Sequence, residues 1–224
     1  MKITGISTTT HVEKDSASVE VLKKVLKILE TLGHDTMFIN ANDLHIVENL
    51  SCYAGGAKNC ASYDSGKYRC WAHFHSVEEP EKYGGVDEMP VIYDAISNSD
   101  IVIFSTSNRW MNHSALLQKI IERMNTLENR VSVYKEKNPL KEKRCGVIVT
   151  GQHYQSQQVA AKLLEVFSLM GFTTSLDEMF TWQKTWNMNK EQGNTSNNIF
   201  VEKYLDSSAG ENQLKDFIKK LLKS

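Results

Sequence analysis

The sequence of 224 residues lacks several features that mark particular classes of protein. It has no excess of charge of one sign, because 26 lysines and arginines nearly balance 27 aspartates and glutamates, giving a net charge of -1. A nucleic-acid-binding face built on surplus basic charge is therefore not expected. No apolar run approaches the roughly 20 residues of a membrane span, and no signal-peptide pattern is present. We expect a cytoplasmic protein that binds neither nucleic acid nor membrane.

Cysteine and the common nucleotide-binding motifs are also scarce. Four cysteines in a chain of this length do not indicate a disulfide scaffold. The spacings G-x-G-x-x-G and G-x-x-x-x-G-K-[ST] are absent, which argues against a dinucleotide or a nucleoside triphosphate at a glycine-rich loop. The chain has no internal repeat and no low-complexity tract.

Short β-prone runs alternate with helical patterns along most of the chain. Asp15 or Ser16 can cap the first helix, and Gly33 ends it because glycine readily adopts φ > 0. A short helix is expected at 89–97, and the helix that includes Leu116 is expected to end near Glu128. The five expected strands cover residues 2–7, 36–40, 101–104, 145–149 and 172–180. A last helix is expected at about 207–222, with Leu214 to Leu222 as its amphipathic part.

This alternation predicts an α/β fold with three layers and a parallel sheet, formed by one domain over residues 1–224. A long insertion, at about 41–90, follows the second strand. Polar loops follow strands one, three and four. In the flavodoxin-like order 2-1-3-4-5 these strands are neighbours, with the switch point between strands one and three. The three loops are therefore expected to line one crevice.

Each loop has a functional and a purely structural interpretation. The loop after strand one is rich in hydroxyls and precedes a helix N-terminus, which suits a monophosphate; otherwise it is a capped helix start with solvated side chains. The loop 105–112 offers amide, guanidinium and indole groups for a flat ring, or is a plain surface loop. Gly151 allows close backbone approach to a ligand, or belongs to a helix cap.

Three blocks of the sequence resemble the NAD(P)H-dependent FMN reductase family of the flavodoxin-like superfamily. They are Ile3-Thr4-Gly5-Ile6-Ser7 with Ser16-Ala17-Ser18, then Ser105 to Trp110 with Leu116 to Lys119 and Glu122-Arg123, then Val149-Thr150-Gly151 with Gly171. The resemblance covers roughly Lys2 to Phe180. The chain departs from the family pattern where Thr9 or Thr10 replaces an arginine, and where Asn108-Arg109 replaces proline and tyrosine.

The resemblance implies a noncovalently bound FMN and NAD(P)H as the electron donor. It implies reduction of a quinone, a nitro or azo compound or a flavin, and a homodimer. It identifies no catalytic acid or base. The phosphate would lie on Ser7, Thr9, Thr10, Ser16 and Ser18. The ring would lie against Thr106, Ser107, Asn108, Arg109, Trp110, Met111, Thr150, Gly151, Gln152 and Tyr154.

The insertion places Cys52, Cys60 and Cys70 where iron–sulfur flavoproteins of this wider group carry a compact cysteine motif. The spacing is looser than such a motif, and Cys145 begins an expected buried strand. Zinc bound by the three cysteines with His73 or His75 is an alternative. We favour free thiols, with no metal, in an ordered lid. Its aromatic residues would cover the flavin or contact a second subunit: Trp71, Phe74 and Tyr83.

Two other functions fit the same fold. A flavodoxin-type electron carrier is usually strongly acidic, whereas this chain is nearly neutral. A binding or regulatory module without a cofactor is the third hypothesis. Its receiver-domain form needs an aspartate at the end of strand three, where the sequence reads Phe104-Ser105-Thr106. An FMN-dependent oxidoreductase remains the leading prediction.

Overall fold

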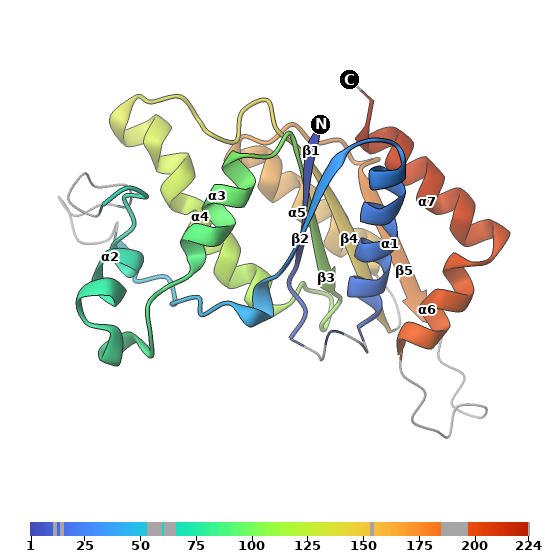
Figure 1. Ribbon diagram of the computed structural model, residues 1–224, viewed down its shortest axis with the longest axis horizontal. Coiled ribbons are helices and arrows are strands. Elements are labelled where there is room, and N and C mark those ends of the chain that lie inside the picture. Colours follow the sequence, from blue (N-terminus) through green and yellow to red (C-terminus); the bar gives the residue numbers. More distant parts are fainter. Residues whose placement is uncertain are drawn as a thin grey trace.

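The computed structural model describes residues 1–10, 13, 16–52, 60, 66–152, 155–184 and 197–223. Within these residues, five parallel strands form one sheet in the order β2-β1-β3-β4-β5, which confirms the predicted order. The strands are β1 (Lys2–Ser7), β2 (Asp35–Asn40), β3 (Ile101–Ser107), β4 (Arg144–Gln152) and β5 (Met179–Lys184). Their carboxyl ends share the lower edge of the sheet in Figure 1.

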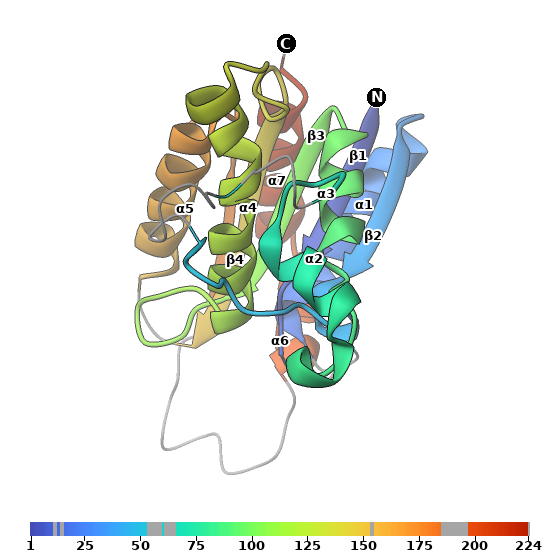
Figure 2. The same ribbon diagram turned by 90° about the vertical axis from the view of Figure 1, so that its left-hand side faces the viewer.

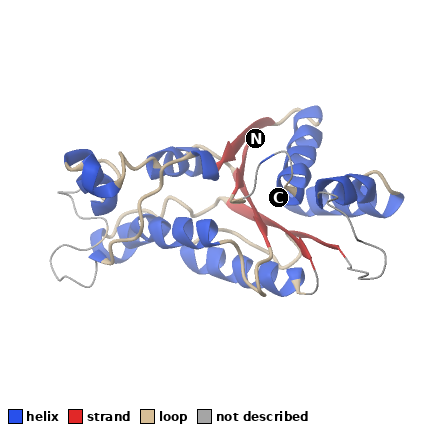
Figure 3. Cartoon of the chain, turned by 90° about the horizontal axis from the view of Figure 1, so that it is seen from below, coloured by secondary structure: helices blue, strands red, loops and turns tan. Residues whose placement is uncertain are grey.

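Helices cover both faces of this sheet, so the predicted three layers are present (Figure 3). One face packs against α3 (Met89–Ser97), α4 (Ala115–Tyr134) and α5 (Ser156–Met170). The other face packs against α1 (Ala17–Thr31), α6 (Asn197–Leu205) and α7 (Ser208–Leu221). None of the described helices is both long enough and apolar enough to cross a bilayer.

The central strand β3 is buried on both faces, as expected for a parallel sheet covered by two layers of helices. Val102 and Phe104 point into one core, and Ile101 and Ile103 point into the other, because side chains alternate along a strand. The Phe104 ring stacks on Phe167 of α5 with 4.5 Å between the ring centroids. This packing fixes the position of β3, whose carboxyl end leads into one of the predicted cofactor-binding loops.

The helix α1 lies very close to β1. A Cβ on Gly5 would come within 2.8 Å of the Leu22 side chain, so only glycine allows this approach. The predicted end of the helix is confirmed, since Gly33 has a φ of 84° in the turn that leads to β2. This packing holds the first turn of α1 beside the carboxyl end of β1.

Several predicted boundaries are wrong. The fifth strand begins at Met179 and not at Phe172, because Phe172 packs into the core beside Phe167 and Phe104. Trp182, which lies beyond the expected end of this strand, is a buried residue of β5. The helix α4 continues past Glu128 to Tyr134, where Lys135 adopts a left-handed conformation and ends it.

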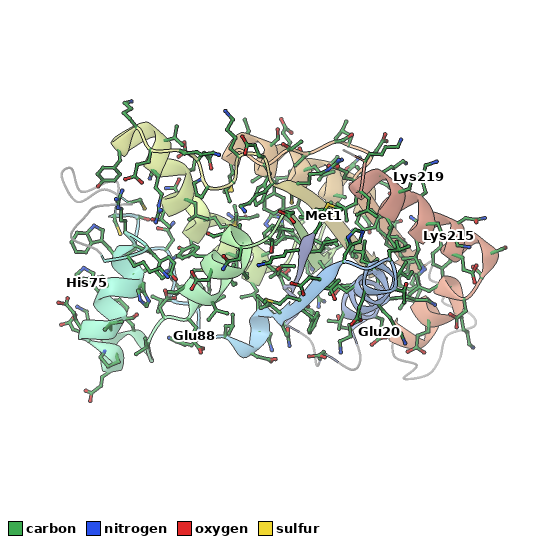
Figure 4. All side chains as sticks on the ribbon, turned by 45° about the horizontal axis from the view of Figure 1, so that its top comes forward. Met1, Glu20, His75, Glu88, Lys215 and Lys219 are labelled. Carbon is green, nitrogen blue, oxygen red and sulfur yellow. The ribbon has the colours of Figure 1, made fainter. Side chains whose placement is uncertain are left out.

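The insertion after β2 lies outside α3 and α4, away from the sheet (Figures 1 and 2). Its described part contains the short helices η2 (Ala41–Asp43), α2 (Trp71–Glu78) and η5 (Pro80–Tyr83). Figure 4 shows His75 of α2 at one end of the molecule and Lys215 of α7 at the other. The insertion thus extends the fold on the side of α4.

A buried ion pair attaches the insertion to α4. The Arg123 guanidinium donates to both carboxylate oxygens of Asp87, over 2.9 and 2.6 Å, and to the Val47 carbonyl over 2.6 Å. Burial acts to lower the pKa of Arg123, but the hydrogen bonds to Asp87 and the neighbouring negative groups raise it above its ordinary value. Arg123 is therefore charged at every physiological pH, and Asp87 balances that charge inside the protein.

Candidate functional site

Hydrogen bonds connect the carboxyl ends of β1, β3 and β4 at one edge of the sheet. The amide and the hydroxyl of Thr8 both donate to the Ser105 carbonyl, each over 2.9 Å. The Asn108 amide donates to the Thr150 carbonyl over 2.7 Å. The loop after β1 therefore lies beside the end of β3, and the loop after β3 lies beside the end of β4, as the predicted topology requires.

Ser114, which sequence reasoning did not select, joins two of these loops. Its hydroxyl donates to the Thr8 carbonyl over 2.7 Å and accepts from the Leu117 amide over 3.1 Å as the N-cap of α4. It also contacts the Thr106 hydroxyl at 3.2 Å, and its own amide donates to that hydroxyl. A serine directly before a helical pattern is the sequence signal that could have identified it.

We expect Ser114→Ala to lower both stability and ligand affinity. Loss of the N-cap costs about 0.5–2 kcal/mol, which corresponds to a fall in Tm of roughly 2–4 °C per kcal/mol for a chain of this size. The bond to Thr8 is lost as well, so the first loop is released from α4. Thermal unfolding and a ligand titration measure the two effects.

Ser207→Ala is the matched control for this variant. Ser207 caps α7, where its hydroxyl accepts from the Gly210 amide over 3.2 Å, outside the three loops. We expect a similar loss of stability without a change in ligand affinity. Equal affinities for Ser114→Ala and Ser207→Ala would contradict a role of Ser114 in the site.

The first loop places several hydroxyl groups around the start of α1. Ser7 is fully buried at the end of β1, and its hydroxyl has no hydrogen-bond partner among the described residues. The hydroxyls of Ser16 and Ser18 lie 3.0 Å apart, and the Ser18 carbonyl accepts from the Ser105 hydroxyl. Thr9 is buried, whereas Thr10 is exposed. Four of the five predicted phosphate residues are thus buried together near one helix N-terminus.

The positive charge of Lys23, in α1 near this loop, is already paired. Lys23 forms an ion pair with Glu13, and the Asn40 amide group lies 3.4 Å from the same carboxylate. Burial and the nearby Glu202 raise the pKa of Glu20 in the first turn of α1. An anion here would be held mainly by hydroxyls and by free amide groups of the first turn of α1.

The second loop begins at Asn108, directly after β3, and contains a tight turn formed by Arg109, Trp110, Met111 and Asn112. Arg109 and Asn112 pair through two backbone hydrogen bonds of 2.7 and 3.0 Å. Trp110 and Met111 both have positive φ values, 51° and 64°, which cost roughly 1–2 kcal/mol per residue for side chains other than glycine. Ser105, Thr106 and Ser107, which were expected in the loop 105–112, belong to β3.

The third segment belongs to β4, because the strand continues through Thr150, Gly151 and Gln152. Gly151 packs directly on the second loop, since a Cβ at this position would lie 2.7 Å from the Asn108 Cβ. Thr150 is buried. The Gln152 side chain and the whole of Tyr154, two predicted ring contacts, lie outside the described residues.

These residues are suited to a phosphate ester that carries a flat ring. The buried Ser7 hydroxyl lacks a partner, and a buried polar group is normally hydrogen-bonded. The loop after β3 packs on the end of β4 at Gly151, which has no side chain to hold the two apart. The donor set therefore fits an anion at the start of α1 and a planar group along the second loop and the end of β4.

His113, also missed in the sequence, is buried just before the Ser114 cap. It pairs with Gln118 at 2.8 Å through Nε2, and Nδ1 has no partner among the described residues. Burial lowers the pKa of His113. A neutral imidazole therefore supports the start of α4.

The three cysteines of the insertion gather beside α4. The Arg123 Nη2 atom lies 3.2 Å from the Cys70 sulfur, and the Asn125 amide group lies 3.9 Å from the Cys60 sulfur. Burial raises the pKa of Cys52, and burial with the nearby Cys52 raises that of Cys60 to about 11. No three histidine, cysteine or acidic side chains within the described ranges are arranged as metal ligands. The free-thiol interpretation stays a prediction.

The aromatic residues of the insertion contact one another. The Trp71 ring centroid lies 5.4 Å from that of Phe74 and 5.3 Å from that of His75, and the His75 ring is nearly parallel to Tyr83. Trp71 is buried. A role for these rings as a flavin cover or a dimer contact also stays a prediction.

The sequence profile of the NADPH-dependent FMN reductase family matches residues 1–187. The chain belongs to this family. Family membership identifies the protein as an FMN-dependent NAD(P)H reductase, with FMN as the cofactor and NAD(P)H as the electron donor. A comparison with curated proteins finds no match. Family membership therefore establishes the type of reaction, but it does not identify the electron acceptor.

Solved structures similar to this reductase share its fold. RosB, crystallised with the intermediate 8-demethyl-8-formylriboflavin-5'-phosphate, is 16% identical with a TM-score of 0.69; the match covers 98% of this chain and 76% of RosB. The apo NADH:FMN oxidoreductase EMOB is 16% identical with a TM-score of 0.55, over 100% and 91% of the two chains. The NAD(P)H:quinone oxidoreductase from Methanothermobacter marburgensis is 12% identical with a TM-score of 0.53, over 98% and 93%.

Proposed function

We propose that this FMN-dependent reductase passes electrons from NAD(P)H to a quinone, a nitro or azo compound or a free flavin. The proposed position of the FMN phosphate rests on one observation. The buried Ser7 hydroxyl has no partner among the described residues and lies at the topological switch point between β1 and β3. A phosphate oxygen is the natural partner for such a group beside a helix N-terminus.

We propose the following residues as the FMN site. The phosphate is held by hydroxyls of the first loop and by the first-turn amides of α1. The ring lies along the backbone of the second loop and the end of β4. The phosphate residues are Ser7, Thr9, Thr10, Ser16 and Ser18, and the ring residues are Thr106, Ser107, Asn108, Arg109, Trp110, Met111, Thr150, Gly151, Gln152 and Tyr154.

FMN, when bound, would supply the redox chemistry that links NAD(P)H to the electron acceptor. The residues of this chain bind and orient the cofactor. Ser114 and Thr8 hold the first and second loops together, and Asn108 holds the second loop to β4. We assign no proton transfer to a side chain, because the hydride steps need no dedicated acid or base.

The purified chain is expected to bind FMN at least about tenfold more tightly than riboflavin, since each tenfold step equals about 1.4 kcal/mol and the phosphate site supplies that difference. Quenching of flavin fluorescence measures both affinities. NAD(P)H oxidation with an added quinone measures turnover. A protein that binds neither FMN nor riboflavin would refute the proposal. Equal affinities for the two flavins would show that the protein has no site for the phosphate.

Steady-state oxidation of NAD(P)H distinguishes the proposed reductase from a flavodoxin-type electron carrier. A carrier binds FMN but oxidises NAD(P)H only very slowly, whereas a reductase shows saturable steady-state turnover. Family membership and the near-zero net charge favour the reductase. We also propose that residues 1–224 form one domain that assembles as a homodimer, which size-exclusion chromatography with light scattering tests directly.

A further inference from the structure

The turn formed by Arg109 to Asn112 (the Trp110 turn) exposes two large apolar side chains beside the proposed FMN site. Trp110 has a relative exposure of 101% and Met111 of 62%. Large apolar groups exposed together often mark a binding surface. Neither side chain belongs to the two hydrophobic cores, so both are open to a ligand.

Hydrogen bonds on both sides fix the Trp110 turn. Arg109 and Asn112 pair through their backbones, and the Arg109 Nε donates to the Ser107 hydroxyl over 3.1 Å. Two-residue turns with φ > 0 at both central positions favour Asn-Gly, because other side chains are strained there. This chain instead places tryptophan and methionine at those positions. Such strain persists where the surroundings hold it and is concentrated at ligand-binding sites.

The Trp110 turn also carries a positive charge. Arg109 is exposed, and no carboxylate pairs with it among the residues that the structure describes. Trp110 and Arg109 are consecutive, so an aromatic surface and a free cation lie at the same turn. A planar ring with an acidic substituent satisfies both, because the ring stacks on the indole and the acid pairs with the guanidinium.

We propose that the Trp110 turn binds the electron acceptor, and that the acceptor is a planar aromatic compound with an anionic substituent, such as a sulfonated quinone. The proposal rests on the proposed function and reassigns the side chains of Arg109 and Trp110 from the flavin ring to the acceptor, so that only the backbone of the turn faces the flavin. NAD(P)H, one proton and a quinone give NAD(P)⁺ and a hydroquinone, which balances without any group from Trp110 or Arg109. These two residues determine specificity through binding alone.

Kinetics of two variants test this assignment. With 1,4-naphthoquinone-2-sulfonate, Trp110→Ala is expected to raise KM about tenfold with little change in kcat, because stacking contributes to binding and not to chemistry. Trp110→Phe should recover most of the loss. Arg109→Gln should raise KM for the sulfonate but not for menadione, which is neutral. Reduction of ferricyanide, which has no aromatic ring, should not change in Trp110→Ala.

Two matched controls remove similar groups elsewhere. Leu169→Ala removes an exposed apolar side chain from α5, and Lys215→Gln removes an exposed charge from α7, at the end of the molecule opposite His75 in Figure 4. Both control variants should have the wild-type KM for every acceptor. A weaker FMN affinity in Trp110→Ala, an equal loss with ferricyanide, or a changed oligomeric state would each overturn the proposal. Unchanged KM values would do the same.

A binding measurement keeps this test separate from the proposed function. Naphthalene-2-sulfonate cannot be reduced by the enzyme, and its binding to the FMN-loaded protein can be followed by calorimetry. We expect saturable binding that Trp110→Ala and Arg109→Gln each weaken about tenfold. Absence of this binding in a protein that oxidises NAD(P)H with a quinone overturns the inference alone. If the protein shows no turnover, the proposed reductase function is refuted. The binding measurement then still shows whether the Trp110 turn binds a planar aromatic anion.

Discussion

Asp87→Asn is expected to lower the free energy of unfolding by about 3–5 kcal/mol, because it leaves the Arg123 charge buried without a partner. Asp87 is 1% exposed and accepts hydrogen bonds from both terminal nitrogens of Arg123 and from the Val47 amide. An asparagine can accept with one oxygen only and carries no charge. Urea unfolding, monitored by circular dichroism, measures the change.

The control for Asp87→Asn is the same substitution at an exposed pair. Asp94 lies 3.4 Å from Lys67, and their side chains are 52% and 74% exposed, so Asp94→Asn should change stability by about 0–1 kcal/mol. Replacing Asp87 and Arg123 together by leucine and methionine should recover much of the loss, since it removes the unpaired charge. A loss below about 1 kcal/mol in Asp87→Asn would show that the pair does not anchor the insertion.

Gly151→Ala is expected to weaken FMN binding by up to on the order of 10²-fold, because small displacements of binding groups have effects of that size. The new Cβ would lie 2.7 Å from the Asn108 Cβ, and neither atom can move without its backbone. The second loop must therefore shift away from β4 and lengthen the hydrogen bond from Asn108 to Thr150. Quenching of flavin fluorescence measures the affinity.

Asn108→Gly provides the rescue for this variant. It removes the atom that the new Cβ meets, so the double variant Gly151→Ala with Asn108→Gly should bind FMN more tightly than Gly151→Ala alone. The melting temperature of Gly151→Ala should fall as well, by an amount that matches about 1–3 kcal/mol of overpacking. Wild-type FMN affinity in Gly151→Ala would place the flavin ring away from this contact.

The sequence predicted the sheet order and the neighbouring positions of the strand ends because both follow from general rules. Alternating strands and helices with right-handed crossovers leave few topologies. Once the order was assigned, the ends of β1, β3 and β4 had to be neighbours. Met89 to Ser97 was also predicted correctly as a helix, since its boundaries depend on local apolar spacing. Local pattern and topology together determine these features.

The errors arose where tertiary contacts override the local pattern. Phe172 is apolar and β-prone, but it packs on Phe167 as a core residue outside β5. Ser114 and Thr8 lie 106 positions apart, so no sequence window could reveal their hydrogen bond. The partner of Arg123 was equally hidden, because Asp87 lies in an insertion with no regular pattern. Pairings of this kind depend on the assembled fold.

The helix α4 has a mechanical consequence for the whole molecule. Its 20 residues form a rod about 30 Å long. Ser114 at its first turn is bonded to the loop after β1, and Arg123 near its middle is bonded to the insertion after β2. The loop after β1 and the insertion are therefore attached to the same helix, so we expect a displacement of one along the helix axis to be felt at the other.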